Sequence, residues 1–174
     1  MELLDLYTKD KVKTGKTVER HTKIPEGFYR LVVHVCIFDR SGKMLIQQRQ
    51  TFKDGYAGVW DFTAGGAALA GDSSADAIER ELEEELGIHI DFSDKRPSVT
   101  IHFQTGFNEI YLVEADVPLS DLKLQFEEVR DAKYATKEEI LDMMKKGQFV
   151  PYHPGLVELL FFMKGRTGAI VGLD

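Results

Sequence analysis

The stretch GAALAGDSSADAIERELEEELGI, residues 66–88, is the most informative part of the sequence. It predicts a loop followed by a helix. Asp72 and Ser73 are good N-cap residues, and Asp76, three residues after Ser73, suits a capping box. Gly87 is a natural left-handed C-cap. We therefore expect a helix over residues 74–86.

Five glutamates fall within seven residues of this predicted helix. At 100° per residue, one apolar stripe should face a sheet, and its members are Ala75, Ile78, Leu82 and Leu86. Glu79 and Glu83 fall on the far side, where solvent is expected. The other three stand at positions i, i+3 and i+4 and share a third face: Glu81, Glu84 and Glu85.

This acidic face needs a positive partner, because like charges on one side of a helix repel each other. Arg80, four residues before Glu84, can hold one carboxylate but cannot neutralise three. Hard divalent cations such as Mg²⁺ prefer oxygen ligands and leave positions open for water and substrate phosphates. The pattern therefore favours a metal site, with a solvated acidic helix face as the alternative.

The composition of the chain limits the other possibilities. It has 174 residues, 43% hydrophobic and 29% charged, which is ordinary for a globular protein. A net charge of −7 disfavours a general nucleic-acid or anionic-membrane surface. Cys36 is the only cysteine, so no internal disulfide is possible and a reducing compartment fits. Residues 1–5 lack the basic start of a signal peptide, and no apolar run is long enough to span a membrane, so we expect a cytoplasmic protein.

The rest of the chain indicates one α/β domain over residues 1–174. The first 27 residues predict a small β-hairpin. A glycine-rich loop is expected after residue 48, with Gly55, Gly58, Gly65, Gly66 and Gly71. Strands are expected at 29–39, 44–48, 99–104, 108–116 and 132–135, and further helices at 137–146 and 154–164.

Residues 66–88 resemble the Nudix box, G-x5-E-x7-R-E-U-x-E-E-x-G-U, where U is an aliphatic residue. Every fixed position agrees except one, where Asp72 replaces glutamate. The resemblance implies a Nudix α/β/α sandwich with a mixed sheet, which here also carries the N-terminal hairpin. It further implies an enzyme that hydrolyses a diphosphate linkage with Mg²⁺, or with Mn²⁺ as an alternative.

The resemblance also implies roles for individual residues. The metal ligands would be the Gly66 carbonyl, Glu81, Glu84 and Glu85, and Arg80 would orient Glu84. Glu81 is the first candidate for the general base.

Two acidic positions outside this set have open roles. Glu128, six residues before Tyr134, is the second candidate for the base and a possible further metal ligand, although the adjacent Glu127 could take that role. Asp72 would either contact the metal or cap the helix.

Three segments extend the resemblance, over about residues 1–150, to Nudix proteins related to isopentenyl-diphosphate isomerase. They are Leu45–Arg49, Gly58–Asp61 and Ala64–Gly66. By this similarity Arg49 and Lys53 would contact the diphosphate, with solvated surface charges as the alternative. The isomerase needs a cysteine and a histidine where this sequence has Gly65 and Ala67. We therefore expect hydrolysis, not isomerisation.

Two other functional classes stay open as alternatives: an isomerase-like enzyme and a non-catalytic Nudix ligand sensor, which would be expected to lose its box carboxylates. The partner should be a small phosphorylated substrate. Nucleoside di- or triphosphates, nucleotide sugars and dinucleotides are all compatible with the sequence, which also leaves the oligomeric state open.

Several aromatic and histidine residues have less specific signals. Trp60, Phe52 and Tyr56 could stack on a base, but we expect them to pack the loop against the core. His34, within a predicted strand, should be a packing or hydrogen-bonding residue. Tyr152 lies just before the last predicted helix and shows no clear chemistry.

Overall fold

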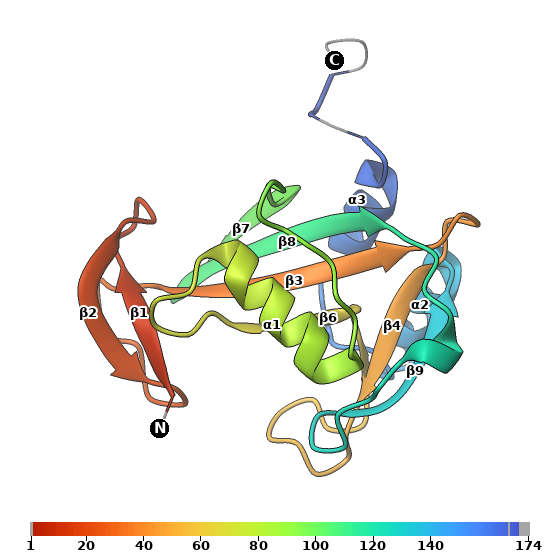
Figure 1. Ribbon diagram of the computed structural model, residues 1–174, viewed down its shortest axis with the longest axis horizontal. Helices are drawn as coiled ribbons and strands as arrows, with labels where there is room; N and C mark the ends of the chain where they lie inside the picture. The colour runs from red at the N-terminus through yellow and green to blue at the C-terminus, as the bar shows by residue number, and fades with distance from the viewer. Residues whose placement is uncertain (1, 167, 171–174) are drawn as a thin grey trace.

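A mixed β-sheet lies at the centre of the computed structural model, which describes residues 2–166 and 168–170 (Figure 1). The elements, in chain order, are β1 (Leu3–Tyr7), β2 (Lys13–Glu19), β3 (Arg30–Phe38), β4 (Met44–Arg49), β5 (Trp60–Asp61), β6 (Ala64–Ala67), α1 (Ser74–Leu86), β7 (Val99–Phe103), β8 (Gly106–Glu114), the 3₁₀ helix η1 (Leu119–Asp121), β9 (Val129–Ala135), α2 (Lys137–Lys145) and α3 (Pro154–Met163).

Strand β3 organises the sheet. It pairs in parallel with β8 along its whole length and antiparallel with β4 and β6. The described part of the sheet has seven strands, with the main order β5-β4-β3-β8-β7 and with β6 and β9 added beside β3 and β4. Strand β3 is a near-continuous run of apolar residues, which suits this central position because both faces of the strand are covered.

Two apolar cores lie on the two faces of the sheet. Alternate residues of β3, such as Val33 and Val35, pack with Ile78 and Leu82 of α1. Residues of the opposite parity, such as Cys36, pack with α2 and α3 instead. The chain is therefore an α/β/α sandwich, as the sequence predicts, with α1 on one face and the other two helices behind it (Figure 1).

The N-terminal hairpin predicted over residues 1–27 is present as β1 and β2, which pair antiparallel. It stands at one end of the main sheet (Figure 1) and is tied to it by a backbone bridge between Tyr7 and Tyr29. Lys11, at the hairpin turn, forms an ion pair with the buried Glu109 of β8. The backbone amide of Ala70 also donates to the Leu3 carbonyl at 2.7 Å. Together these contacts hold the hairpin beside the loop that precedes α1.

The glycine-rich region differs from the expectation of a simple loop. It contains the short strands β5 and β6, and β6 runs beside β3 with Gly66 opposite Val33 and Gly65 opposite His34. Glycine is depleted in strands, so propensity alone argued against this assignment. The strand is defined by its antiparallel pairing with β3, and glycine is required in it because atoms of Val33, His34 and Glu81 occupy the space where a Cβ atom would stand.

Among the described residues, no helix combines the length and the apolar character needed to cross a membrane.

Candidate active site

Helix α1 begins and ends at the residues that the sequence predicts. The Ser73 hydroxyl accepts a hydrogen bond from the Asp76 amide at 3.1 Å, and the Asp76 carboxylate accepts one from the Ser73 amide at 2.8 Å. Gly87 closes the helix with φ of 67°, a conformation that glycine adopts at little cost. These caps fix the ends of the helix, and the packing of Ile78, Leu82 and Leu86 against the sheet sets its rotation and therefore the direction of its carboxylates.

Glu81 is buried where α1 crosses β6. Its side chain is only 8% exposed, and one carboxylate oxygen accepts a hydrogen bond from Arg80 at 2.8 Å. A Cβ atom on Gly66 would lie 2.5 Å from this carboxylate, so the glycine makes room for the acid. Burial raises the pKa of Glu81, and the nearby Arg80 only partly opposes that rise. The carboxylate is therefore held at a defined place and is a stronger base than an exposed one.

Glu85 lies one turn further along the same buried side of α1. One of its oxygens accepts hydrogen bonds from the Gln47 amide at 2.8 Å and from the Gly65 backbone N–H at 3.3 Å. Burial raises the pKa of Glu85 well above the ordinary value, and the negative charge of Glu81 adds to the rise. A cation close to this pair would stabilise the ionised forms of both carboxylates.

Arg80 links the acidic residues of this region. Its guanidinium contacts Asp72 at 3.1 Å, Glu81 at 2.8 Å and Glu84 at 3.4 Å. The proposed capping role of Asp72 is wrong, because the N-cap is Ser73. Asp72 instead accepts a hydrogen bond from the Leu69 amide at 3.0 Å and holds Arg80.

The three predicted carboxylate ligands are not gathered into one cluster here. Glu81 and Glu85 are buried, whereas the Glu84 side chain is 51% exposed. Among residues 2–166 and 168–170, no three histidine, cysteine or acidic side chains lie close enough together to hold a metal ion. Arg80 contacts both Glu81 and Glu84 through the same nitrogen. Each of these two carboxylates meets Arg80 through one oxygen, so its second oxygen is the one that a cation could contact.

The donor chemistry nevertheless fits a hard divalent cation. The candidate ligands are carboxylate oxygens, and two of them belong to acids, Glu81 and Glu85, whose pKa values burial raises. The backbone of Gly66, the fourth predicted ligand, adjoins the Glu81 carboxylate.

The two predicted phosphate-binding residues have different environments. Arg49 is 20% exposed, and within the part of the chain that the structure describes its guanidinium makes only long polar contacts, 3.5 Å to the Gly55 carbonyl and 3.9 Å to the Asp61 carboxylate. Its buried Nε has no hydrogen-bond partner among the described residues. A guanidinium so weakly paired is available to an anionic ligand. Lys53, in contrast, forms an ion pair with Glu128, so the structure brings these two predicted residues together.

This ion pair connects two loops near the end of α1. Residues 50–59, here called loop 50–59, join β4 to β5, and residues 122–128, loop 122–128, lead into β9. The backbone N–H of Gln50 donates to the backbone carbonyl of Glu128 at 2.9 Å, and the backbone N–H of Gln125 donates to the backbone carbonyl of Glu85 at 3.0 Å. Both loops lie side by side at the lower edge of Figure 1, below α1.

A buried polar network continues from Arg49 into the core, and sequence reasoning gave it no role. The Tyr152 hydroxyl donates to the Asp61 carboxylate at 2.9 Å and lies 3.3 Å from His34, whose other nitrogen meets Asn108 at 2.8 Å. His34 is thus a hydrogen-bonding residue, as expected. Asp61 and Tyr152 are 91 positions apart, so local sequence pattern contains no signal for their contact.

Position 65 has no room for the thiol of an isomerase. A Cβ atom there would lie 2.6 Å from the Val33 carbonyl oxygen and would overlap the His34 ring. Real Cβ atoms essentially never approach backbone so closely. A cysteine at position 65 would therefore require the surrounding backbone to shift.

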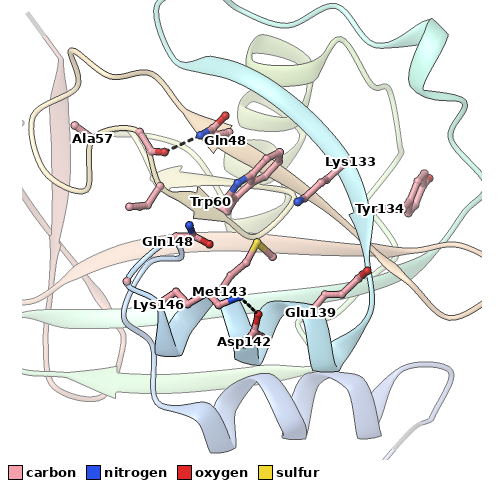
Figure 2. Close-up of a pocket in the computed structure, with 13 residues that line it drawn as sticks. Gln48, Ala57, Trp60, Lys133, Tyr134, Glu139, Asp142, Met143, Lys146 and Gln148 are labelled. Carbon is pink, nitrogen blue, oxygen red and sulfur yellow. Dashed lines mark hydrogen bonds and ion pairs between the residues drawn. The ribbon is translucent and has the colours of Figure 1, made fainter.

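The aromatic residues of loop 50–59 differ from expectation. Phe52 and Tyr56 are 59% and 57% exposed, so the prediction that they pack the loop against the core is wrong. Trp60 is partly buried and has the Lys133 ammonium 4.3 Å from its ring centre. It lines a surface cavity of about 590 Å³ beside β9 and α2 that contains none of the predicted catalytic, metal or phosphate residues (Figure 2).

Comparison with known proteins agrees with this geometry. A family model described as NUDIX domain matches residues 28–159. An uncharacterized Nudix hydrolase of Listeria monocytogenes is 46% identical over 167 residues, which cover 96% of this chain and 98% of the relative. The crystal structure of DR0079 from Deinococcus radiodurans shares the fold, with a TM-score of 0.72 at 23% identity over 91% of this chain and 97% of that one.

The isomerase-like subgroup has weaker support. An isopentenyl-diphosphate Delta-isomerase of Streptomyces avermitilis is 25% identical over 155 residues, 84% of this chain and 77% of the isomerase. The family match covers most of the chain and agrees with the closely similar hydrolase. The chain therefore belongs to the Nudix family, as a hydrolase that acts on pyrophosphate bonds.

Proposed function

We propose that this protein cleaves a diphosphate linkage in a nucleoside diphosphate-type small molecule, with Mg²⁺ or Mn²⁺ as cofactor. Nudix hydrolases generally act on such linked diphosphates and generally use divalent metals. The observation that carries the proposal is the pair of buried carboxylates, Glu81 and Glu85, held against the Gly65–Gly66 backbone with Arg80 beside them.

The metal would be held by Glu81, Glu84, Glu85 and the Gly66 carbonyl. When bound, it supplies positive charge that stabilises the charge developing on the phosphoryl oxygens. Arg80 is a positioning residue in this proposal, because it already contacts both Glu81 and Glu84.

A carboxylate must also remove a proton from the attacking water. Glu81 is the first candidate, because its raised pKa makes it a better proton acceptor near neutral pH than an exposed glutamate. Glu128 is the second, and its ion pair with Lys53 would have to open for it to act. Arg49 and Lys53 would bind the diphosphate, the first through a planar fork and the second as a point charge.

The proposal treats residues 1–174 as one functional unit, with the hairpin as part of the domain. It places the enzyme in the cytoplasm, because a reducing environment suits the single, fully buried cysteine.

A substrate panel with product identification tests the function. Nucleoside di- and triphosphates, nucleotide sugars and dinucleotides would be incubated with Mg²⁺, with and without excess chelator. We expect metal-dependent release of a product cut at the diphosphate. No turnover of any compound would refute the proposal and favour a ligand sensor. Deuterium incorporation during incubation with isopentenyl diphosphate in heavy water would instead favour the isomerase alternative.

A further inference from the structure

Two aromatic side chains are exposed next to the site without an explanation from folding. Phe52 is 59% exposed in loop 50–59, and Phe126 is 71% exposed in loop 122–128. Their rings contact each other, with centroids 5.8 Å apart and planes tilted by 42°. Exposed phenyl rings leave apolar surface in water, and two that meet across separate loops form a ready binding surface.

The position of this aromatic pair is fixed by the same contacts that define the rim of the site. Lys53, next to Phe52 in sequence, forms the ion pair with Glu128, two residues after Phe126. The backbone N–H of Gln125, the residue before Phe126, donates to the backbone carbonyl of Glu85. The aromatic pair therefore lies on loops anchored to the carboxylate helix and beside a cation proposed to bind phosphate.

We infer that Phe52 and Phe126 form a subsite that stacks on the planar ring of a nucleobase in the substrate. This inference rests on the proposed function, because it places the base at one end of a molecule whose diphosphate lies at Arg49 and the α1 carboxylates. Flat aromatic faces favour offset stacking on another π-system, and they accept any base because every base has such a face.

The other aromatic residue of the region is a weaker candidate. The ring of Trp60 already has the Lys133 ammonium over it at 4.3 Å. Its cavity is lined by charged side chains that are partly neutralised within the protein, such as Lys146 paired with Asp142 at 2.6 Å.

Binding of non-hydrolysable ligands tests the inference directly. Calorimetry in Mg²⁺ would compare α,β-methylene-ADP, which has a base, with methylenediphosphonate, which has none. Phe52→Ala and Phe126→Ala should each weaken the first ligand relative to the second by roughly 5- to 150-fold, the cost of losing one stacking contact. Phe126→Tyr should restore the wild-type ratio. Phe162→Ala removes a similarly exposed ring (62%) from α3 and should leave the ratio unchanged.

Two results would overturn the inference: no measurable binding of α,β-methylene-ADP to the wild type, or a ratio that stays unchanged in both alanine variants because both ligands are weakened equally or not at all. A dimeric wild type that becomes monomeric in these variants would also overturn it, by assigning the aromatic pair to a contact between subunits. Turnover of the substrate panel is measured separately. A changed binding ratio together with no turnover of any panel compound would refute the proposed function but not the aromatic subsite.

Discussion

Replacing Gly66 with alanine should reduce turnover sharply while leaving the fold intact. The added Cβ atom would lie 2.5 Å from the Glu81 carboxylate, whereas ordinary contacts begin at 3.4 Å. The carboxylate must therefore move by about 1 Å. A displacement of about 1 Å in a catalytic group costs about 100-fold in rate, or roughly 2.7 kcal/mol of activation free energy.

The stability cost of the same change should be small. The clashing atoms are the end of a flexible side chain, so Glu81 can move without shifting the backbone. We expect a loss near the lower limit for overpacking, about 1 kcal/mol, which lowers Tm by about 2–4 °C in a domain of this size. The assay combines kcat on the substrate found by the panel with a melting curve for each variant.

Gly155→Ala is the matched control. A Cβ atom at Gly155, in the first turn of α3, would meet no atom within 4 Å, and the backbone there does not require glycine. This variant should keep wild-type kcat. Wild-type kcat in Gly66→Ala would refute the reasoning, because it would show that the position of the Glu81 carboxylate does not matter. A loss of fold in Gly66→Ala alone would show that the close approach serves structure instead.

Three further predictions concern Arg49, Tyr152 and Glu85. Arg49→Lys should lower kcat/KM by about 10- to 150-fold, since lysine cannot reproduce a bidentate contact, and an unchanged value in both Arg49→Lys and Arg49→Ala would remove Arg49 from the site. Tyr152→Phe removes the hydroxyl group that donates to Asp61 and should lower the free energy of unfolding, measured by urea titration, by about 1 kcal/mol. An unchanged free energy of unfolding would mean that water replaces this hydrogen bond. Burial raises the pKa of Glu85, so the stability contributed by its protonated carboxyl is present below the ordinary pKa of 4.5 and is lost as pH rises above that value. In chelator, Glu85→Gln should therefore raise Tm more at about pH 8 than at about pH 5. A change in Tm that does not depend on pH would contradict this prediction.

The parts of the structure that local sequence determines were predicted well. The bounds and caps of α1 follow from Ser73, Asp76 and Gly87, because capping is a property of a few neighbouring residues. The sandwich and the N-terminal hairpin followed from the box resemblance and from the strand patterns. Helical periodicity placed Glu81, Glu84 and Glu85 on one face of α1, but it did not show that Glu81 and Glu85 are buried while Glu84 is exposed.

The parts that depend on contacts distant in sequence were not predicted. The Asp61–Tyr152 hydrogen bond and the Phe52–Phe126 contact each join segments more than 70 residues apart. The Lys53–Glu128 pair is similar, since both residues were chosen for separate roles and neither choice implied the other. Strand β6 was not predicted because its glycines indicate a loop. They are required there by close contacts with β3 and α1, which the local sequence does not reveal.

The central claim is that the carboxylates of α1 hold the catalytic metal, and turnover of single-charge variants tests it most directly. Glu84→Gln and Glu85→Gln would be assayed with Mg²⁺ beside Glu83→Gln, which removes an exposed carboxylate from the opposite side of the same helix. We predict losses of at least about 100-fold in the first two, with circular dichroism showing an intact helix, and a change within about twofold in the control. Near-normal turnover in both Glu84→Gln and Glu85→Gln would contradict the claim.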